Sequence, residues 1–295
     1  MKGLAIVYQS RTTANIFKNL FAEKGVEIDI MSTQELYKGI TKEKIKLPLS
    51  QTWDFVLLYC HKKYDSKGIF DLLANDGIRV FNTPSAVEKC GDKWLTYKAL
   101  QEANIPQMPT YENYNDAKEN GLLETDENGN KLLKKIVVKE LYGSFGEQVY
   151  LSSYLSDLKR LLEDLKSKNA RFLLQEFCET TQNRGARITC IGGKFVATYY
   201  KKSKDGDFRV NLHKGSIGIQ WQPPKSFIDM AEKTAQAIGA DYCGIDFMFG
   251  EFDTPIVCEV NSMAAFSAME KINEMDIKGM YVDYIISKVM EGDLL

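Results

Sequence analysis

Short apolar runs alternate with amphipathic stretches over the first eighty residues, and each run predicts a strand. Between the first two runs, apolar side chains recur at helical spacing from Ile16 to Phe21, and Gly25 follows as a stop signal. Alternating strands and helices predict a small parallel α/β domain that ends near Asn82. The runs are Leu4–Tyr8, Val26–Met31, Phe55–Cys60 and Ile78–Phe81.

A helix start follows this first domain. Thr83 is a residue type that caps helices, and Pro84 suits the first helical position. A second helix is predicted over Asp92–Ala103. The stretch 111–131 is polar and rich in Asn and Asp, so we expect it to be an excursion rather than part of the core.

From Ile136 onward the pattern favours antiparallel sheet. Gly192 and Gly193 have the spacing of a two-residue hairpin turn, and amphipathic helices are predicted around Phe227–Ile238 and Ile277–Ile285. The fold class is therefore α+β in three parts, with residues 1–82, 83–174 and 175–295 as the parts. The predicted hairpin strands are Ile136–Lys139 with Gln148–Ser152, Ile188–Ile191 with Phe195–Tyr200, and Gly244–Phe249 with Pro255–Val260.

The last hairpin places acidic side chains in an apolar setting. Asp246 lies within the first strand, and alternation makes Glu259 and Asn261 project together from one face of the second. Neither strand contains Lys or Arg, and an unpaired buried carboxylate is costly. A hard divalent cation such as Mg²⁺ would offset that cost. The alternative is that both carboxylates face solvent on a half-exposed sheet. The other face of the second strand is expected to carry Ile256, Cys258 and Val260.

A glycine-containing loop joins two of the predicted strands. Gly143, Ser144 and Gly146 allow backbone N–H groups to point together at an anion. Lys139, at the end of the preceding strand, offers a point charge suited to phosphate. The alternative is an ordinary hairpin with a surface lysine.

Composition and charge mainly exclude classes of partner and of metal site. The net charge of −2 gives no reason to expect nucleic acid as a partner. No apolar run reaches membrane-spanning length and the N-terminus lacks a signal-peptide core, so we expect a cytoplasmic protein without a membrane partner. The six cysteines form no C-x-x-C pair, which favours small buried hydrophobes over zinc ligands.

The loop and the acidic hairpin, about a hundred residues apart, resemble the ATP-grasp superfamily and, within it, the RimK-type glutamate ligases. The resemblance covers nearly the whole chain. It implies an ATP-grasp fold, in which a parallel α/β domain precedes two subdomains with antiparallel sheets that sandwich ATP. The segments that carry it are NTPSAVEKCGDKWLTYKALQEANIPQMPT, VVKELYGSFGEQVYL, LLQEFC, GDFRVNLHKG, and GIDFMFG with VCEVNS.

The resemblance also implies roles for individual residues. Lys93 and Lys139 would bind ATP phosphates, and Arg187 would contact the nucleotide. Arg209 and Asn211 would be catalytic, next to the γ-phosphate and the acyl phosphate. The loop Tyr142, Gly143, Ser144, Phe145, Gly146 and Gln148 would cover the phosphates, the hinge Glu176, Phe177 and Cys178 would receive the adenine, and Asp246, Glu259 and Asn261 would hold the metal.

Two positions depart from the pattern of these relatives. Gly185 stands where they usually carry an Asp that helps to bind ATP, so one contact is absent or comes from elsewhere, for example from Glu179 or Gln182. The segment SMAAF after Asn261 replaces the proline and glycine of many relatives, next to the substrate site. The family's substrate is therefore not carried over.

The activity implied is ATP-dependent amide formation between a small-molecule or peptide carboxylate and an amine, for example the amino acid glutamate. Cofactors would be ATP and Mg²⁺, or Mn²⁺ in its place. An ATP-grasp kinase and a nucleotide-binding regulator without catalysis remain open. Relatives are often homodimers or homotetramers, and no residue pattern here tests that.

Two groups of lysines lie outside this set of roles. Lys63, like its neighbour Lys62, could attract an acidic substrate, with a solvated loop as the default. We interpret Lys201, Lys202 and Lys204 as a solvated strand end, with a patch that guides a phosphate or carboxylate as the alternative.

Overall fold

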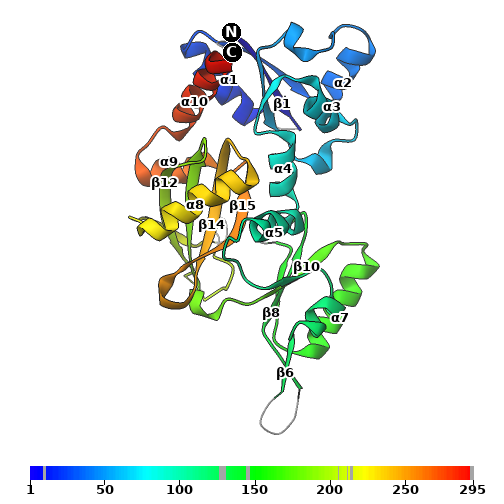
Figure 1. Cartoon of the computed structure of the whole chain (residues 1–295), viewed down its shortest axis with the longest axis vertical. Coiled ribbons are helices and arrows are strands. Elements are labelled where there is room, and N and C mark those ends of the chain that lie inside the picture. Colours follow the sequence, from blue (N-terminus) through cyan, green and yellow to red (C-terminus); the bar gives the residue numbers. More distant parts are fainter. Residues whose placement is uncertain are drawn as a thin grey trace.

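The computed structural model describes residues 1–8, 11–125, 131–143, 147–204, 206–210, 212 and 215–292. Three larger sheets follow one another along the long axis of the molecule (Figure 1), and Leu123–Thr125 and Lys131–Leu133 form a fourth, two-stranded sheet. The N-terminal sheet lies at one end beside the last helix, the largest sheet lies in the middle, and a smaller sheet lies at the other end (Figure 1). None of the helices in the described ranges is long and apolar enough to cross a membrane.

The N-terminal domain is a parallel sheet with strand order β2-β1-β3-β4, which confirms the four predicted strands. Helix α2 was not predicted from the sequence, although a capping box starts it: Ser32 accepts from the Glu35 N–H, and the Glu35 carboxylate accepts from the Ser32 N–H. The elements are β1 Lys2–Val7, α1 Thr12–Glu23, β2 Glu27–Ser32, α2 Thr33–Thr41, η1 Leu49–Gln51, β3 Phe55–Tyr59, η2 Lys62–Tyr64, α3 Ile69–Asp76 and β4 Arg79–Phe81.

The central part has an antiparallel sheet with order β5-β10-β8-β9. Thr83 caps α4 by accepting from the Ala86 N–H, as predicted, and Asp92 caps α5. The elements are α4 Pro84–Gly91, α5 Lys93–Glu102, β5 Thr110–Tyr111, α6 Tyr114–Glu119, β6 Leu123–Thr125, β7 Lys131–Leu133, β8 Ile136–Glu140, β9 Val149–Ser152, α7 Leu155–Ser167 and β10 Phe172–Glu176.

Three features of this part differ from the prediction. The stretch 111–131 is not only an excursion, because Ala117 and Leu122 are buried in the same apolar cluster as the sheet. Helix α7 was not predicted, although Leu158, Leu162 and Leu165 recur at helical spacing and pack onto that cluster. Strand β10 continues to residue 176, so the predicted boundary between residues 174 and 175 falls inside it.

The C-terminal part is a five-stranded antiparallel sheet with order β13-β12-β11-β14-β15. Gly192 and Gly193 form the predicted turn, with φ angles of 57° and 72° that favour glycine. The elements are η3 Glu179–Thr181, β11 Arg184–Ile191, β12 Lys194–Lys202, β13 Ile217–Gln220, α8 Lys225–Ile238, β14 Tyr242–Phe249, η5 Glu251–Asp253, β15 Pro255–Asn261, α9 Phe266–Asn273 and α10 Ile277–Gly292.

The two ends of the chain share one core. Phe17 of α1 packs edge-on against Phe266 of α9 and Tyr281 of α10, with ring centroids 5.6 and 6.1 Å apart. Tyr242 of β14 stacks on Phe266 at 4.4 Å. The N-terminal domain is therefore packed against the C-terminal part through its apolar side chains.

Asn82 joins the same two parts through hydrogen bonds. Its side chain is 2% exposed and donates to the carbonyl oxygens of Tyr242 at 2.7 Å and Ser262 at 3.0 Å. The Tyr242 N–H donates back to Asn82 Oδ1 at 2.9 Å. A single buried amide thus satisfies three backbone groups of the C-terminal part.

We predict that Asn82→Ala lowers the free energy of unfolding by about 2–4 kcal/mol, because it leaves buried backbone groups without partners. Urea denaturation of both proteins measures this difference. Asn75→Ala is the control, since that exposed side chain bonds only the Asp71 carbonyl within its own helix. An equal, small effect of the two substitutions would contradict the role given to Asn82.

Candidate functional site

The β14–β15 hairpin brings the three predicted metal residues to one face of the sheet. Asp246 lies directly opposite Glu259, and Asn261 lies opposite Gly244. A register shift follows the Asp246–Glu259 pair, and Phe247 then faces Val257. The hairpin therefore presents two carboxylates and one amide from neighbouring positions.

The same shift corrects the predicted apolar face of β15. Val257 is 1% exposed and belongs to the core, whereas alternation placed Cys258 there. Cys258 instead points its sulfur toward Lys139, whose ammonium lies 3.8 Å away. A bulge of this kind re-aims side chains locally, and bulges are common next to functional sites.

Asp246 is not an unpaired buried carboxylate. Lys201 of β12 donates to Asp246 Oδ1 at 2.6 Å, and Arg187 of β11 donates to both carboxylate oxygens. Burial alone would raise the pKa of Asp246, but these two cations outweigh burial and lower it below its ordinary value. The prediction that a metal must offset the charge of Asp246 is wrong, because Arg187 and Lys201 on neighbouring strands supply positive charge.

The donor set still fits a hard cation. Glu259 and Asn261 are half-buried, and neither side chain forms a hydrogen bond or ion pair within the described ranges. Carboxylate and amide oxygens are the protein ligands that Mg²⁺ takes, with phosphate oxygens and water filling its remaining positions. Among the residues that the structure describes, no group of three or more His, Cys, Asp and Glu side chains could hold a metal.

Two lysines from different parts of the chain hold the start of the glycine loop. Lys63 of η2 donates to the Tyr142 carbonyl oxygen at 3.2 Å. Lys93, the first residue of α5, donates to the Gly143 carbonyl oxygen at 2.8 Å. The first contact links the N-terminal domain to the central part.

A third lysine lies between this loop and the acidic hairpin. Lys139 of β8 donates to the Gln175 side-chain oxygen at 2.7 Å. Burial lowers the pKa of Lys93; Glu259 acts in the opposite direction, and Lys139 adds to the lowering. In the described part of the chain none of the lysines 63, 93 and 139 forms an ion pair. Ammonium groups held by neutral acceptors favour an anionic ligand, because charge-assisted hydrogen bonds are stronger.

The described ends of the glycine loop lie close together. The Glu140 N–H donates to the Gln148 carbonyl at 3.1 Å, and a Cβ on Gly143 would lie 2.9 Å from Gln148 Oε1. The Tyr142 hydroxyl accepts from Arg171 at 3.1 Å. Glycine at position 143 therefore suits this close approach, since a larger residue would make the Gln148 side chain shift. The predicted loop residues Ser144, Phe145 and Gly146 lie outside the described residues.

The predicted hinge leaves the central sheet at the end of β10. The Glu176 carboxylate accepts from the Tyr111 hydroxyl at 2.7 Å, which holds it within the central part. Phe177 packs edge-on against Phe208 at 6.1 Å, and Cys178 is buried. The side chains of Glu176, Phe177 and Cys178 are therefore held in place by these contacts. The segment that carries them leads from the central sheet to the C-terminal sheet.

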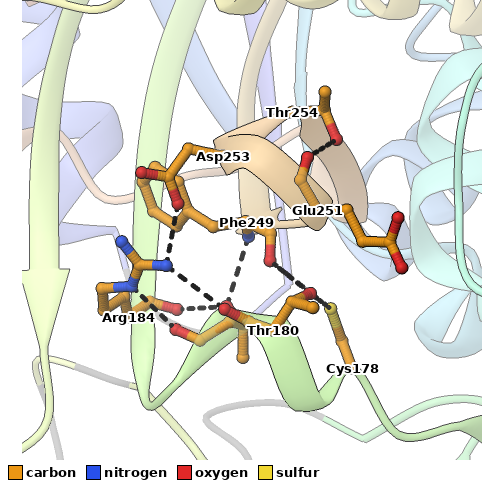
Figure 2. Close-up of polar contacts among 8 residues, drawn as sticks. Cys178, Thr180, Arg184, Phe249, Glu251, Asp253 and Thr254 are labelled. Atoms are coloured by element: carbon orange, nitrogen blue, oxygen red, sulfur yellow. Dashed lines mark hydrogen bonds and ion pairs between the residues drawn. The ribbon is translucent and has the colours of Figure 1, made fainter.

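Figure 2 shows how the segment after the hinge is fastened to the β14–β15 turn. Thr180 Oγ1 donates to the Phe249 carbonyl oxygen at 2.9 Å, and the Cys178 thiol points at the same oxygen from 3.7 Å (Figure 2). Arg184 pairs with Asp253 at 2.8 Å and also donates to the Thr180 carbonyl at 3.2 Å (Figure 2). The hinge is therefore anchored on its C-terminal side.

The structure does not bring Arg209 into contact with the metal residues. Its guanidinium forms hydrogen bonds with both Asp207 carboxylate oxygens, at 2.9–3.2 Å, and this pairing raises the pKa of Arg209. Its proposed role requires it to exchange Asp207 for a ligand. Asn211, the other predicted catalytic residue, lies outside the described residues.

The residues suggested as replacements for the Asp of relatives lie in η3 and directly after it. Glu179 pairs with Lys135 at 2.8 Å. Gln182 follows η3 in a left-handed turn, with φ 48°. Neither fact indicates that the Glu179 or Gln182 side chain points toward the acidic hairpin. Gly185 itself lies on β11, opposite Lys201 of β12.

The sequence did not predict the contacts that Lys201 and Lys63 make at the site. Lys201 is 6% exposed, so it is wrong to call it part of a solvated strand end. Its strand runs two residues further than predicted, and Lys201 shares a face with the buried Ala197 and Tyr199. That alternation was the missed signal. No sequence pattern could predict the contact of Lys63 with Tyr142, because only the tertiary fold brings the two residues together.

A sequence model of the RimK-like ATP-grasp domain matches residues 90–285, which is more than half of the chain. The chain belongs to the RimK-like ATP-grasp family. This confirms the family and the α+β fold that the sequence predicted, and the ligase and synthase names of relatives agree with the predicted class of reaction.

The chain is also similar to individual proteins. It is 26% identical over 276 residues to an uncharacterised protein of Mycoplasma pneumoniae, with 89% of this chain and 92% of that protein covered. It is 29% identical over 221 residues to human beta-citrylglutamate synthase B, with 74% of this chain covered. The match spans only 55% of the human protein's length.

Among solved structures, the chain resembles the ATP-grasp ligase PsnB complexed with a phosphomimetic variant of its minimal precursor, Mg and ADP. The TM-score is 0.69 at 16% identity, with 97% of this chain and 98% of that chain covered. At this identity the likeness shows the fold alone.

We predict that Lys63→Ala weakens binding of Mg-ATP about tenfold, because one charge-assisted contact to an anionic ligand is lost. Isothermal titration should show AMP binding unchanged, since AMP lacks the distal phosphates. Lys62→Ala is the matched control, because Lys62 pairs with Asp71 at 3.0 Å. Wild-type affinity for Mg-ATP in Lys63→Ala would refute a phosphate-facing role.

Proposed function

We propose that this protein is an ATP- and Mg²⁺-dependent carboxylate–amine ligase. The observation that carries the proposal is that Lys63 and Lys93 donate to the start of the glycine loop, while Lys139 lies between that loop and the β15 edge that carries Glu259 and Asn261. Cationic and acidic groups at one place suit a metal-bound polyphosphate. Family membership supports the same conclusion.

Glutamate is the amine that the comparisons favour. The human relative is a citrylglutamate synthase, a name that specifies glutamate in the product. We propose an amino acid of this kind as the amine and a small-molecule or peptide carboxylate as its partner. The free thiols of all six cysteines support a cytoplasmic location.

In the proposed reaction a carboxylate oxygen attacks the γ-phosphate of ATP, giving an acyl phosphate and ADP. The amine then adds to the acyl carbon, phosphate leaves and the amine loses a proton. Lys93 and Lys139 would hold the phosphates, while Asp246, Glu259 and Asn261 would hold the metal. Bound Mg²⁺ supplies charge neutralisation for the transferred phosphoryl group. Mn²⁺ has the same ligand preference and would serve in its place.

Arg209 is the residue proposed to act on the transferring group. Its five donors in a planar fork suit a phosphoryl group and, later, the tetrahedral oxyanion. Asp207 now holds this fork in place, with the Arg209 side chain 31% exposed and reachable by a ligand. A phosphoryl group would compete with the Asp207 carboxylate for the same donors.

We predict that Arg209→Ala lowers kcat by about 10²–10³ while Mg-ATP still binds, because the interaction develops only in the transition state. Steady-state ADP release and ATP titration measure the two quantities. Arg160→Ala, which removes an exposed arginine paired with Asp157 on α7, is the control. An unchanged kcat in Arg209→Ala would remove this residue from the mechanism.

The function itself is tested by ADP and phosphate release from purified protein with Mg-ATP, across pooled carboxylates and amino acids, with mass spectrometry of the products. A product heavier by one condensed residue, formed only when both substrates are present, establishes the ligase. A phosphorylated product that needs no amine identifies a kinase. ATP binding without turnover in any pool indicates a regulator and overturns the proposal.

A further inference from the structure

Lys201 is a buried cation with a carboxylate partner at the proposed metal site. The side chain is 6% exposed, and its ammonium lies 2.6 Å from Asp246 Oδ1. Arg187 pairs with the same carboxylate. Two cations from β12 and β11 thus occupy the oxygens that a metal would use.

The Lys201 side chain passes next to Gly185 on the neighbouring strand. The two residues are register partners on β11 and β12. A Cβ at position 185 would lie 3.4 Å from Lys201 Cε and 3.3 Å from the Phe247 carbonyl oxygen. A larger side chain at this position would press on the Phe247 carbonyl and would also touch the lysine. Glycine leaves this space to Lys201, whose ammonium is directed at Asp246.

Within the C-terminal sheet the charges balance without a metal. Asp246 and Glu259 carry two negative charges, and Arg187 and Lys201 carry two positive charges. A divalent cation alone would add two positive charges to this partly buried setting, where Lys93 and Lys139 already add positive charge nearby, which is unfavourable. Polyphosphate oxygens would offset this positive charge.

We propose that Lys201 is an internal counter-cation for Asp246, so that the site accepts a divalent metal only together with a polyphosphate. Lys201 is a positioning residue here, since it acts through the carboxylate. The inference rests on the proposed function, because it takes Asp246, Glu259 and Asn261 as the metal residues. It adds that the protein does not hold the metal in advance of the nucleotide.

Binding of Mn²⁺ to the full chain tests this, with electron paramagnetic resonance and equilibrium dialysis as readouts that need no turnover. Wild-type protein should retain little Mn²⁺ alone and a stoichiometric amount with the non-hydrolysable analogue AMPPNP. Lys201→Met should bind Mn²⁺ alone about tenfold more tightly, because one repelling charge is gone. Lys201→Arg should behave as wild type. Lys202→Met, at the exposed neighbour, is the control.

The outcomes separate the two proposals. Tight binding of Mn²⁺ alone by wild-type protein, or equal affinity in wild type and folded Lys201→Met, overturns the role of Lys201 but leaves the ligase proposal intact. Absence of retained Mn²⁺ even with AMPPNP overturns the metal assignment itself. Thermal melting shows whether Lys201→Met folds, and the wild-type measurements decide the question even if it does not.

Discussion

A carboxylate inside a sheet needs positive charge beside it, and the C-terminal part of this protein is organised around that need. Asp246 lies on β14, and its cations come from β11 and β12. A slip of one residue in either pairing would turn the charged side chains to the opposite face. The ion pairs and the strand register therefore support each other. That same register places Glu259 opposite Asp246 and sets the acidic edge of the site.

Much of the fold follows from local patterns in the sequence. Apolar runs located the parallel strands, a Thr–Pro pair located the start of α4, and two consecutive glycines located the β11–β12 turn. Alternation also placed Glu259 and Asn261 on one face, because no irregularity separates them. These signals work because each depends on neighbours within a few residues.

The features that the sequence did not reveal depend on contacts between distant residues. No pattern within β14 or β15 shows that Arg187 and Lys201 neutralise Asp246. The prediction that a metal must do so therefore left out these two cations. The bulge at Cys258 likewise follows from the pairing of β14 with β15. Lys63 meets Tyr142 across 79 positions of sequence. Helix α7 is different, since its leucine spacing was present and was overlooked.

The core shared by α1 and α10 has a consequence for synthesis of the chain. Phe17 leaves the ribosome long before its partner Tyr281. The N-terminal domain therefore cannot complete the core on this face of its sheet until α10 has been made, although its four strands are available earlier. Contacts of such large sequence separation slow folding and leave apolar surface exposed in the meantime. Folding of the first domain is thus tied to synthesis of α9 and α10.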